Sequence, residues 1–562
     1  MVVIKTSFND IQELIEKELT VEELDKLIAF AKAEVDNIDG DELEIDIKTS
    51  NRPDLWCAEG IAREVKGILG KEKGLPRYEL KKSNLKVIVS SELSKTRPYI
   101  ACAVVKGIKL SDYMIKQLMQ LSEKIDLSYG RRRKRTSIGM YNLSMIKSPI
   151  EYKVANKNYS FVPLGFNEKM TVEKILEQHP KGHEYGYILK EYKQFPILIS
   201  ANGMTLSMPP IINSNDVGRI TEETTECLIE VTGNNYQAVN VVLNVLCQTL
   251  ADRGAEIYSV DIEYPKEILG KTVQTPENKP KEIIVSLEEI NRYLGVKLSA
   301  TKAIQLLEKR RLEAEKMDKN TLKVFTPPYR NDFLHWVDVS EEVAIALDYN
   351  KICPTKWKVL TTGGLLPETE SENIVREILV GMEATEILTN TLVDPIVFTE
   401  KVNIKETNFI KIANPVSLTY SVLRNYIFPG LINVLAKNTH EPYPQSIFEV
   451  GEVVKVIENK PVTQTNACFM YDDAEASFED AHKVLDRLMQ LLGVTYKLET
   501  YEHPTFLSGR CGKIIIADKE CGIIGEIHPE VLEKNQIWLP VAGFEIELYA
   551  IPTLDCKRKG TW

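Results

Sequence analysis

The sequence predicts an α+β protein of several domains. Its 562 residues are too many for a single hydrophobic core, and the usual size of a domain suggests roughly three to five units. Short runs rich in β-branched residues alternate with segments of helical periodicity. Charged segments that contain glycine and proline interrupt this alternation. Together these observations predict four domains, at residues 1–83, 84–268, 269–355 and 356–562.

The first predicted domain, residues 1–83, is a small α+β unit that opens with two helices. The second helix begins after Thr20, whose side chain forms a capping box with Glu23. The strand LEIDI at 43–47 then leads through a turn to an amphipathic helix, which ends at Gly70.

The second predicted domain, residues 84–268, combines strands and helices. The runs LKVIV, YIACAVV, FPILI and CLIEV have strand composition, while DYMIKQLMQLSEKI and AVNVVLNVLCQTLADRG have helical periodicity. The sequence therefore predicts a mixed α/β domain in this region.

The third predicted domain, residues 269–355, has two short helices followed by a hairpin. The first helix is capped by Ser286 and closed by Gly295, and the second begins at Ser299. Residues 318–320 form the predicted hairpin turn. Two helices followed by a hairpin resemble a winged helix.

The fourth predicted domain, residues 356–562, is another mixed module. IANPVSLTYSVLRNYIFPGLINVLAKN and SIFEVGEVV predict a strand, a turn that contains an arginine, a helix and an antiparallel strand. Near the end, GRCGKIIIADKECGIIGEIHPEVL has glycines at turn spacing only, with no glycine-rich segment that could hold ATP. Nucleotide binding by this domain is therefore not expected.

Composition and charge restrict the function. The chain is 43% hydrophobic and 27% charged, as folded proteins are, and its net charge of −11 argues against a protein that coats polyanions. Any contact with RNA is therefore confined to local basic patches. The nine cysteines form no CxxC pair and no zinc-type spacing, which indicates reduced, mostly buried thiols. Without a signal segment or a membrane-spanning run, we expect a cytoplasmic protein that contacts no membrane.

Four acidic residues gather around a predicted helix start at Ser340. Asp338, Glu341 and Glu342 follow helical spacing and share one face, and the preceding turn delivers Asp332. Four carboxylates at one point would suit Mg²⁺. The alternative is that acids at a helix N-terminus merely complement the helix dipole, and the pattern by itself favours this alternative.

The densest basic run, GRRRKR at residues 130–135, lies between a helix and a strand. It would suit binding of phosphate groups, and a solvated loop is an equally good interpretation.

Two further segments place polar groups near rigid backbone. CLIEVTG puts Glu230 and Thr232 on one face of a strand, and two prolines fix the turn after Ser207 in LSMPPIIN. The pattern by itself favours a strand that faces solvent over a pocket. No GxSxG elbow, HExxH motif or P-loop is present, so no familiar nucleophile is indicated.

Several motifs in order give the chain an end-to-end resemblance to a known family. NRPDLWCAEGIARE, GRRRKRTSIGMYNL, FVPLGF, LSMPPIIN, YRNDFLHWVDVSEEVAIALDYN, IANPVSLTYSVLRNYIFPGLI and IFEVGEVV resemble the beta subunits of phenylalanyl-tRNA synthetases, in their archaeal and eukaryotic-cytosolic form. The resemblance implies a tetramer of two alpha and two beta subunits that charges tRNA(Phe). The alpha subunit would bind phenylalanine and ATP. The last domain here would be a class II catalytic-like module, with an antiparallel sheet and no catalytic residue for aminoacylation.

The resemblance also implies a metal site. Family members bind Mg²⁺ at a site shared with the alpha subunit, and the spacing of its ligands is reproduced by Asp332, Asp338, Glu341 and Glu342. On this basis the third domain would carry a Mg²⁺ site, in contrast to the interpretation from the helix dipole alone.

The second domain resembles the family's editing domain, which hydrolyses tyrosine misattached to tRNA(Phe). A pocket that hydrogen-bonds the extra hydroxyl group can select tyrosine strongly, whereas a pocket shaped for phenylalanine rejects it weakly. The resemblance assigns the editing pocket to Leu198, Ser207, Glu230 and Thr232, with Glu230 accepting a hydrogen bond from the phenol. Archaeal relatives often carry Asp at the position of Glu230.

Other positions depart from the family pattern. Tyr141 and Asn142 stand where relatives often have His and Asp, and no role follows for either. Two alternatives stay open. The chain could be an RNA-binding or assembly scaffold that has lost editing, or an independent metal hydrolase that uses the acidic residues.

Overall fold

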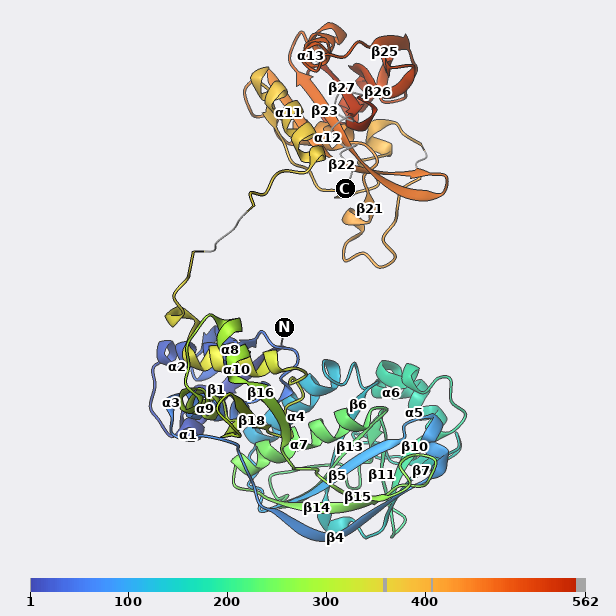
Figure 1. Ribbon diagram of the computed structural model, residues 1–562. Coiled ribbons are helices and arrows are strands. Elements are labelled where there is room, and N and C mark those ends of the chain that lie inside the picture. The colour runs from blue at the N-terminus through green and yellow to red at the C-terminus, as the bar shows by residue number, and fades with distance from the viewer. Residues whose placement is uncertain (1, 357–360, 406–407, 552–562) are drawn as a thin grey trace. The chain divides into compact units, whose positions relative to one another are not determined.

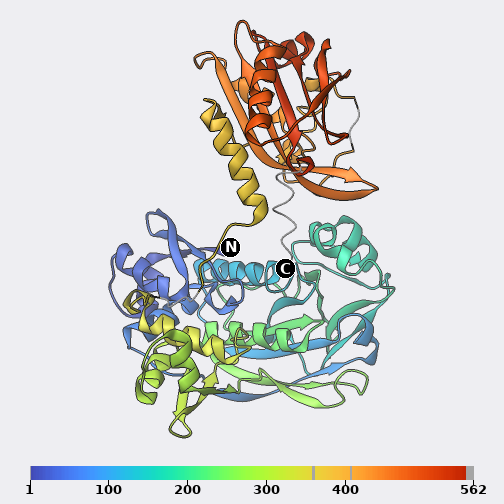
Figure 2. The same ribbon diagram turned by 45° about the horizontal axis from the view of Figure 1, so that its top comes forward.

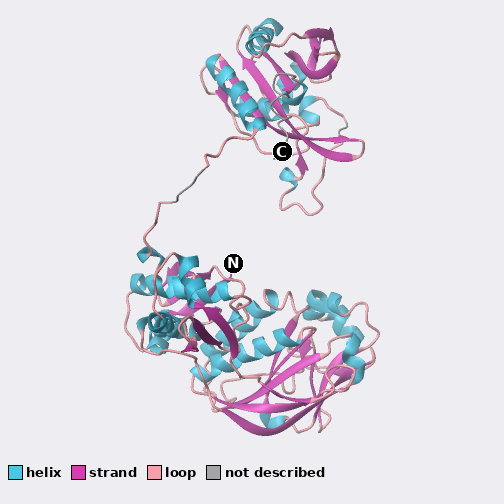
Figure 3. Cartoon of the chain, in the orientation of Figure 1, coloured by secondary structure: helices cyan, strands magenta, loops and turns pink. Residues whose placement is uncertain are grey.

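The computed structural model describes residues 2–356, 361–405 and 408–551. The chain divides into two compact units, one up to residue 356 and one from residue 357 (Figure 1). Both units interleave helices and strands, so the predicted mixed α/β multidomain architecture is confirmed (Figure 3).

The N-terminal part of the first unit is a three-stranded antiparallel sheet of order β1-β3-β2 with three helices. Thr20 and Glu23 form the predicted capping box, and Gly70 ends α3 with a φ of 74°. The elements are β1 (Val2–Ser7), α1 (Phe8–Ile15), α2 (Val21–Ile28), β2 (Ala33–Asp39), β3 (Glu42–Ile47) and α3 (Ala58–Leu69), with 3-10 helices at Ala29–Ala31 and Pro53–Leu55.

A ten-stranded sheet dominates the first unit. Nine strands follow the order β12-β11-β10-β7-β4-β14-β5-β13-β6, and β15 pairs with β14. Strand β4 runs parallel to both of its neighbours, and the other pairs are antiparallel. The strands are β4 (Leu80–Val89), β5 (Tyr99–Lys106), β6 (Thr136–Asn142), β7 (Ile150–Ala155), β10 (Phe195–Ser200), β11 (Thr205–Met208), β12 (Ile212–Asn213), β13 (Glu226–Gly233), β14 (Glu256–Glu263) and β15 (Thr272–Thr275).

Helices accompany this sheet, and α7 lies along one of its faces (Figures 1 and 2). The other elements of this part are α4 (Asp112–Leu127), the pair β8 (Ser160–Phe161) and β9 (Met170–Thr171), α5 (Val172–Gln178), α6 (Pro180–Tyr185), α7 (Tyr236–Asp252) and 3-10 helices at Ser91–Lys95, Leu143–Met145 and Gly186–Ile188. Strand β15 lies beyond the boundary expected at residue 268, so the sheet extends slightly further along the chain than the sequence suggested.

Strand β13 separates two cores. Cys227, Ile229 and Val231 pack with α7 and the N-terminal elements, whereas Leu228 packs on the opposite face with Leu198. Alternate residues of a strand point to opposite faces, so Glu230 and Thr232 lie on the side of Leu228, as the period of two predicts.

The two ends of the ten-stranded sheet meet. The hydroxyl oxygen of Tyr141 on β6 lies at hydrogen-bond distance, 2.8 Å, from Oγ of Ser207 on β11, although the two strands stand far apart in the strand order. The backbone N–H of Asn142 also donates to the carbonyl of Val217 over 2.8 Å. The face opposite α7 therefore curves around an enclosed space.

The last part of the first unit has an antiparallel sheet of order β16-β18-β17 and three helices. Ser286 and Ser299 cap α8 and α9, Gly295 closes α8 with a φ of 68°, and β17 and β18 form the predicted hairpin. The elements are β16 (Lys281–Ser286), α8 (Leu287–Leu294), α9 (Ala300–Lys309), β17 (Glu313–Lys316), β18 (Thr321–Thr326), α10 (Trp336–Leu347) and a 3-10 helix at Tyr349–Lys351.

The predicted start of α10 at Ser340 is wrong. The helix begins four residues earlier, where His335 and Asp338 form a capping box, and Ser340 instead donates to the carbonyl of Trp336. The charged carboxylate of Asp338 accepts hydrogen bonds from unpaired backbone N–H groups at the helix start, and this makes it a stronger cap than the neutral hydroxyl group of Ser340.

The second unit is built on a sheet of order β19-β22-β23-β27-β26-β25-β24. It is antiparallel except for the pair β19 and β22. The elements are α11 (Pro367–Gly381), β19 (Thr385–Glu386), β20 (Leu392–Val393), β21 (Val422–Leu423), α12 (Phe428–Lys437), β22 (Gln445–Ile457), β23 (Lys460–Asp472), α13 (Phe478–Leu491), β24 (Lys497–Thr500), β25 (Phe506–Ile516), β26 (Lys519–Ile527), α14 (Pro529–Asn535), β27 (Val541–Glu547) and 3-10 helices at Glu400–Val402, Leu418–Tyr420 and Leu548–Ala550.

The glycines near the end of this unit do not mark turns, contrary to the expectation. Gly522 and Gly525 lie within β26, and the turn between β25 and β26 falls at Ala517 and Asp518, which both have positive φ. A Cβ atom on Gly522 would lie 2.3 Å from the carbonyl oxygen of Glu545, so close strand packing explains this glycine.

Buried thiols and the absence of a membrane span agree with expectation within the described residues. Seven of the eight described cysteines are buried, Cys353 is exposed, and Cys556 lies outside the described residues. In the described part of the chain, no helix combines the length and the apolar composition needed to cross a membrane.

Candidate functional site

A cavity of about 380 Å³ lies between α4, β6 and the turn that follows β11. Leu118 of α4, Ile138 of β6 and Ile211 of the turn supply apolar wall. Ser207 and Glu230 also line it, and both are only 2% exposed. An apolar pocket with a few convergent polar groups is the usual form of a site for a small organic group.

The structure places all four predicted pocket residues on this side of the sheet, at different depths. Ser207 and Glu230 line the cavity. Leu198 pairs in register with Ser207 and belongs to the core behind it, and Thr232 is also fully buried. The expectation of a solvent-facing strand is therefore wrong, because the core around Tyr141, Leu198 and Leu206 covers this face, together with the proline turn.

Glu230 has one engaged carboxylate oxygen and one free of hydrogen bonds. Tyr141 donates its hydroxyl hydrogen to Oε2 of Glu230 over 2.5 Å. Oε1 is buried and accepts no hydrogen bond from any described residue. Burial raises the pKa of Glu230 to about 6, and the hydrogen bond from Tyr141, the nearby hydroxyl group of Thr232 and the charge of Arg97 oppose this rise.

Arg97 is a buried cation behind the cavity that the sequence reasoning missed. It donates to Oγ1 of Thr232 over 2.9 Å, to the carbonyl of Thr232 over 2.7 Å and to Oγ of Ser137 over 3.0 Å. Burial lowers the pKa of Arg97. No local pattern in the sequence marks it, because its hydrogen-bond partners lie 36 or more positions away.

Asp126 is a second buried carboxylate of the cavity wall. Its Oδ2 pairs with Nε of Arg133 at 2.9 Å, whereas Oδ1 has no hydrogen-bond partner among the described residues. Burial raises the pKa of Asp126 to about 7, against the opposing charges of Arg133 and Arg97. A sequence signal existed, since Asp126 follows directly on the buried apolar positions Leu121 and Ile125 of α4.

The basic loop at residues 130–135 forms part of the same site. Arg131, Arg132 and Arg133 all have left-handed backbone conformations, with φ of 52°, 53° and 63°. Arg133 lies 4.2 Å above the ring of Tyr185 and donates to the carbonyl of Ile211 over 3.0 Å, so it ties the loop to the cavity wall.

Three other cations of the loop face solvent, whereas Arg135 is half-buried over the ring of Tyr129. Arg131, Arg132 and Lys134 are exposed and make no ion pair with a described residue, and Lys134 lies 5.2 Å above the ring of Tyr187. The loop is therefore partly structural, and it also presents three cations to solvent beside the cavity.

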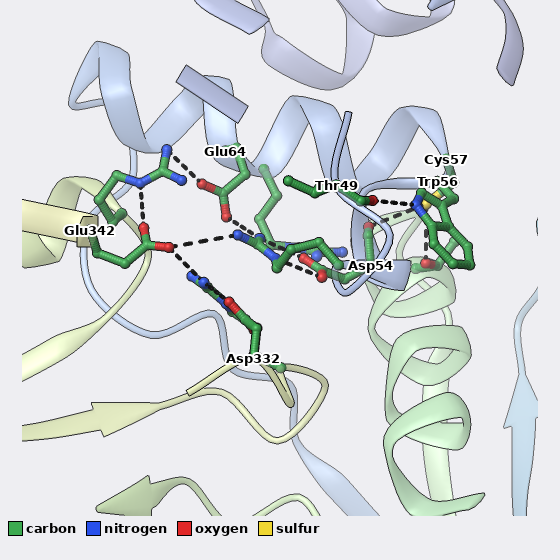
Figure 4. A network of polar contacts seen from close by, with 12 residues as sticks. Thr49, Asp54, Trp56, Cys57, Glu64, Asp332 and Glu342 are labelled. Atoms are coloured by element: carbon green, nitrogen blue, oxygen red, sulfur yellow. Dashed lines mark hydrogen bonds and ion pairs between the residues drawn. The ribbon is translucent and has the colours of Figure 1, made fainter. Parts of the chain in front are cut away.

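The predicted metal ligands lie in a different part of the first unit, and two of them, Asp332 and Glu342, belong to a buried network of charged groups (Figure 4). Four carboxylates and three guanidinium groups take part, and they come from both the N-terminal elements and the last part of the unit. The members are Arg52, Asp54, Glu64, Arg310, Arg330, Asp332 and Glu342.

Glu342 is at the centre of this network. Its Oε2 accepts from Nε of Arg310 and its Oε1 accepts from Nη2 of Arg330, each over 2.6 Å. Arg330 also makes two hydrogen bonds to Asp332. Burial would raise the pKa of Glu342 and Asp332, but the arginines outweigh it and hold both values below the ordinary range.

The other two predicted ligands have separate partners. Asp338 accepts from the backbone N–H groups of Leu334 and His335, over 2.6 and 2.7 Å, and so caps α10. Glu341 is exposed and pairs with Lys32 at 2.6 Å.

Asp332, Glu341 and Glu342 line one small cavity together with Lys32, Arg52 and Arg310, whereas Asp338 does not, so the expected convergence of all four residues is not found in this chain. Among the described residues, no group of three or more acidic, histidine or cysteine side chains could hold a metal ion. The arginines already neutralise Asp332 and Glu342, and a cation would compete with them for the same oxygens. Within this chain alone, the four residues do not fit Mg²⁺.

Two family models match the chain. One described as "tRNA synthetase B5 domain" matches residues 283–349, and one described as "Phenylalanyl tRNA synthetase beta chain CLM domain" matches residues 352–548.

Curated relatives match over nearly the whole length. The Phenylalanine--tRNA ligase beta subunit of Pyrococcus furiosus is 42% identical over 547 residues, which cover 96% of this chain and 98% of the relative. The subunit of the same name from Pyrococcus horikoshii is 42% identical over 549 residues, with the same coverage of 96% and 98%.

One solved structure is similar to the first unit. It is the crystal structure of an N-terminal fragment of the phenylalanyl-tRNA synthetase beta subunit from Pyrococcus horikoshii, with a TM-score of 0.59 and 42% identity. The match covers 61% of this chain and 99% of that fragment.

Proposed function

Because this chain belongs to the family of phenylalanine--tRNA ligase beta subunits, we propose that it pairs with an alpha subunit that carries the aminoacylation site. The two subunits together attach phenylalanine to tRNA(Phe) in the cytoplasm at the expense of ATP. Phenylalanine and ATP bind to the alpha subunit, and the assembly contains two copies of each subunit. The chain contributes no catalytic residue to aminoacylation.

We also propose that the cavity lined by Glu230 and Ser207 hydrolyses tyrosine misattached to tRNA(Phe). The observation that carries this proposal is the buried oxygen Oε1 of Glu230, which has no hydrogen-bond partner among the described residues. A buried acceptor without a donor is costly, so a ligand that brings a hydroxyl group is favoured over one that lacks it. Tyrosine has such a group and phenylalanine does not.

The basic loop supports this proposal by its position. Arg133 lines the cavity, while Arg131, Arg132 and Lys134 are exposed in the same loop. Cations at this place suit the phosphates near the end of a tRNA that carries the amino acid. A local patch also agrees with the net charge of −11, which disfavours binding over the whole surface.

The test is deacylation of tyrosyl-tRNA(Phe) by the complex of this chain with its alpha subunit. Glu230→Ala removes the acceptor of the phenol, and we expect the rate to fall about tenfold to a hundredfold, since a hydrogen bond to a charged group contributes about 1.5–3 kcal/mol. Charging with phenylalanine should stay unchanged, because that site belongs to the other subunit.

Glu123→Ala is the matched control, because Glu123 also lines the cavity but is exposed. It should deacylate tyrosyl-tRNA(Phe) like the unaltered protein. Equal rates for Glu230→Ala and the unaltered complex would refute the editing role. Charging activity by this chain without an alpha subunit would refute the division of labour.

A scaffold subunit without editing is the second candidate. The observation that favours it is the hydroxyl of Tyr141, a phenol that already contacts both Glu230 and Ser207. In that case the complex would charge tRNA(Phe) and leave tyrosyl-tRNA(Phe) intact. An independent metal hydrolase has no such support, because no metal-binding group of three or more side chains occurs in the described ranges.

The Mg²⁺ site shared with the alpha subunit stays a prediction about the assembled enzyme. In this chain only Glu341 has an exposed carboxylate among the four residues, so the partner would supply the remaining ligands. Metal analysis of the complex with and without Glu341→Gln would test this, with loss of bound Mg²⁺ as the expected result.

A further inference from the structure

Tyr141 occupies a special place beside the cavity. Its side chain is fully buried, and its hydroxyl contacts Oε2 of Glu230 over 2.5 Å and Oγ of Ser207 over 2.8 Å. Tyr141 thereby joins three strands, β6, β11 and β13. It does not itself line the cavity, so it approaches Glu230 from behind.

The backbone of β6 makes room for this contact. Gly139 is paired in register with Glu230, two residues before Tyr141. A Cβ atom at position 139 would lie 2.1 Å from the Tyr141 hydroxyl oxygen and 2.4 Å from Oε2 of Glu230. Only glycine leaves the space in which the phenol and the carboxylate meet.

We propose that Tyr141 is a positioning residue for recognition of the ligand. Its hydroxyl holds Oε2 of Glu230, so that Oε1 is the oxygen that accepts the phenol hydroxyl of a tyrosyl ester in the cavity. This inference rests on the proposed editing function and assigns a specificity-determining residue to it. Glu230 then has two phenol donors in the bound state, one from the protein and one from the ligand.

Tyr141 also affects the pKa of Glu230, which depends on all the groups around this carboxylate. Four other titratable groups interact electrostatically with Glu230, and they come from the segment before β5, from α4, from β7 and from β5: Arg97, Asp126, Tyr152 and Cys102.

Burial raises the pKa of Glu230, and the hydrogen bond from Tyr141 lowers it. Loss of the hydroxyl should therefore raise this pKa, and the carboxylate should ionise at a higher pH.

The experiment uses Tyr141→Phe in the complex with the alpha subunit. This variant keeps the ring in the core and removes only the hydroxyl group. We expect kcat/KM for deacylation of tyrosyl-tRNA(Phe) to fall about tenfold at pH 7. We also expect the rise of this activity with pH to move to higher pH. Spontaneous hydrolysis of the ester, measured without enzyme, is subtracted at each pH.

Tyr264→Phe is the matched control. Tyr264 is a buried tyrosine of the same core, and its hydroxyl contacts the backbone of Ile100 and not Glu230. It should leave the pH profile in place. An unchanged rate and profile in Tyr141→Phe would overturn the proposal. A faster rate would also overturn it, because it would mean that the Tyr141 phenol occupies the place of the ligand.

A second measurement needs no editing activity and keeps the two proposals separate. A double-mutant cycle of Tyr141→Phe and Glu230→Gln is followed by thermal unfolding of the chain at pH 5 and pH 8. Glu230 has a raised pKa, so its ionisation destabilises the folded state as pH rises through about 6.

The hydrogen bond from Tyr141 to the ionised Glu230 opposes this loss of stability of the folded state. Tyr141→Phe should therefore lower the unfolding midpoint more at pH 8 than at pH 5, and Glu230→Gln should abolish the difference. If the unaltered complex fails to deacylate tyrosyl-tRNA(Phe) but the cycle shows this coupling, the editing function falls and the positioning contact stands. Absence of coupling at both pH values would overturn the inference whatever the editing result.

Discussion

At the scale of single residues, the buried carboxylates of the first unit fall into two groups. Glu342 and Asp332 have pKa values below the ordinary range, because guanidinium groups outweigh the effect of burial. Glu230 and Asp126 have raised pKa values of about 6 and about 7, because burial dominates. Carboxylates paired with arginines stabilise the structure. Carboxylates with an oxygen that accepts no hydrogen bond line the cavity, where a ligand can supply the missing donor.

Glu342 should be important for stability. Glu342→Gln leaves Arg310 and Arg330 with a buried, uncompensated charge, so we expect a loss of roughly 3–5 kcal/mol in the free energy of unfolding of the first unit at pH 7. Denaturant unfolding followed by circular dichroism measures this loss. Glu341→Gln is the control, since its pair with Lys32 is exposed and should contribute at most about 1 kcal/mol.

The pH dependence gives a further check on Glu342. A lowered pKa means that the stabilisation is present above the pKa of the unfolded chain and is lost as pH falls through the folded value. The difference between Glu342→Gln and the unaltered protein should therefore shrink as pH is lowered below about 4. A difference that stays constant with pH would contradict the assignment of the stabilisation to the ionised group.

Residue-level prediction from sequence succeeded where it depended on local geometry. The period of two placed Glu230 and Thr232 on one face of a strand, and the structure confirms this placement. It did not predict their burial, because the cover comes from residues distant in the sequence, such as Tyr141, Leu198 and Leu206, and from the turn after β11. Nor did the helical spacing of the acidic residues predict their partners, since Arg310 pairs with Glu342 from another helix.

At the scale of elements, β6 links the cavity to the rest of the sheet. It is the terminal strand on the main path of the ten-stranded sheet; Ser137, Ile138 and Met140 line the cavity, and Tyr141 belongs to the core. Gly139 lies in the middle of the strand, opposite Glu230.

Gly139→Ala should therefore abolish editing. The added methyl group would overlap the buried hydroxyl of Tyr141 and Oε2 of Glu230, and the contact between them would be lost. We expect deacylation of tyrosyl-tRNA(Phe) to fall at least about tenfold, with phenylalanine charging retained. The same assay should show no change for Gly381→Ala, because a Cβ atom at residue 381 meets nothing within 4 Å. Normal deacylation by Gly139→Ala would show that this space is not needed.

The elements themselves were predictable to different degrees. The caps at Thr20, Ser286 and Ser299 were found because each depends on a side chain a few residues from its target. The start of α10 was misplaced because Asp338 and Ser340 are both good caps, and the sequence does not say which is used. The glycines of β26 were taken as turn markers because the crowding by β27 arises from residues about 20 positions away.

At the scale of the whole molecule, the division after residue 356 is the main feature. The first unit has its own cores and the buried charge network, and the second unit has a separate core on its seven-stranded sheet. The sequence suggested a boundary near residue 355 from composition. It did not suggest that the three N-terminal regions form one unit, because that depends on contacts such as those between Arg52, Glu64 and Arg310.

A chain of residues 1–356 should consequently fold alone. We expect a single cooperative thermal transition, with a midpoint within about 5 °C of the corresponding transition in the full chain, because the first unit has its own hydrophobic cores. Differential scanning calorimetry of both proteins checks this. A fragment without a cooperative transition would show that the first unit depends on the second.

The contact between β6 and β11 affects which part of this subunit unfolds first. Ser207 and Glu230 come together only while the curled sheet remains shut, yet the charged network near α10 holds independently of that closure. We expect mild heat or denaturant to part the sheet's two ends first, since local opening costs less than global unfolding. On the proposed editing function, a subunit in this condition would still support charging of tRNA but would no longer hydrolyse tyrosyl-tRNA(Phe), so accuracy would be lost under milder conditions than charging activity.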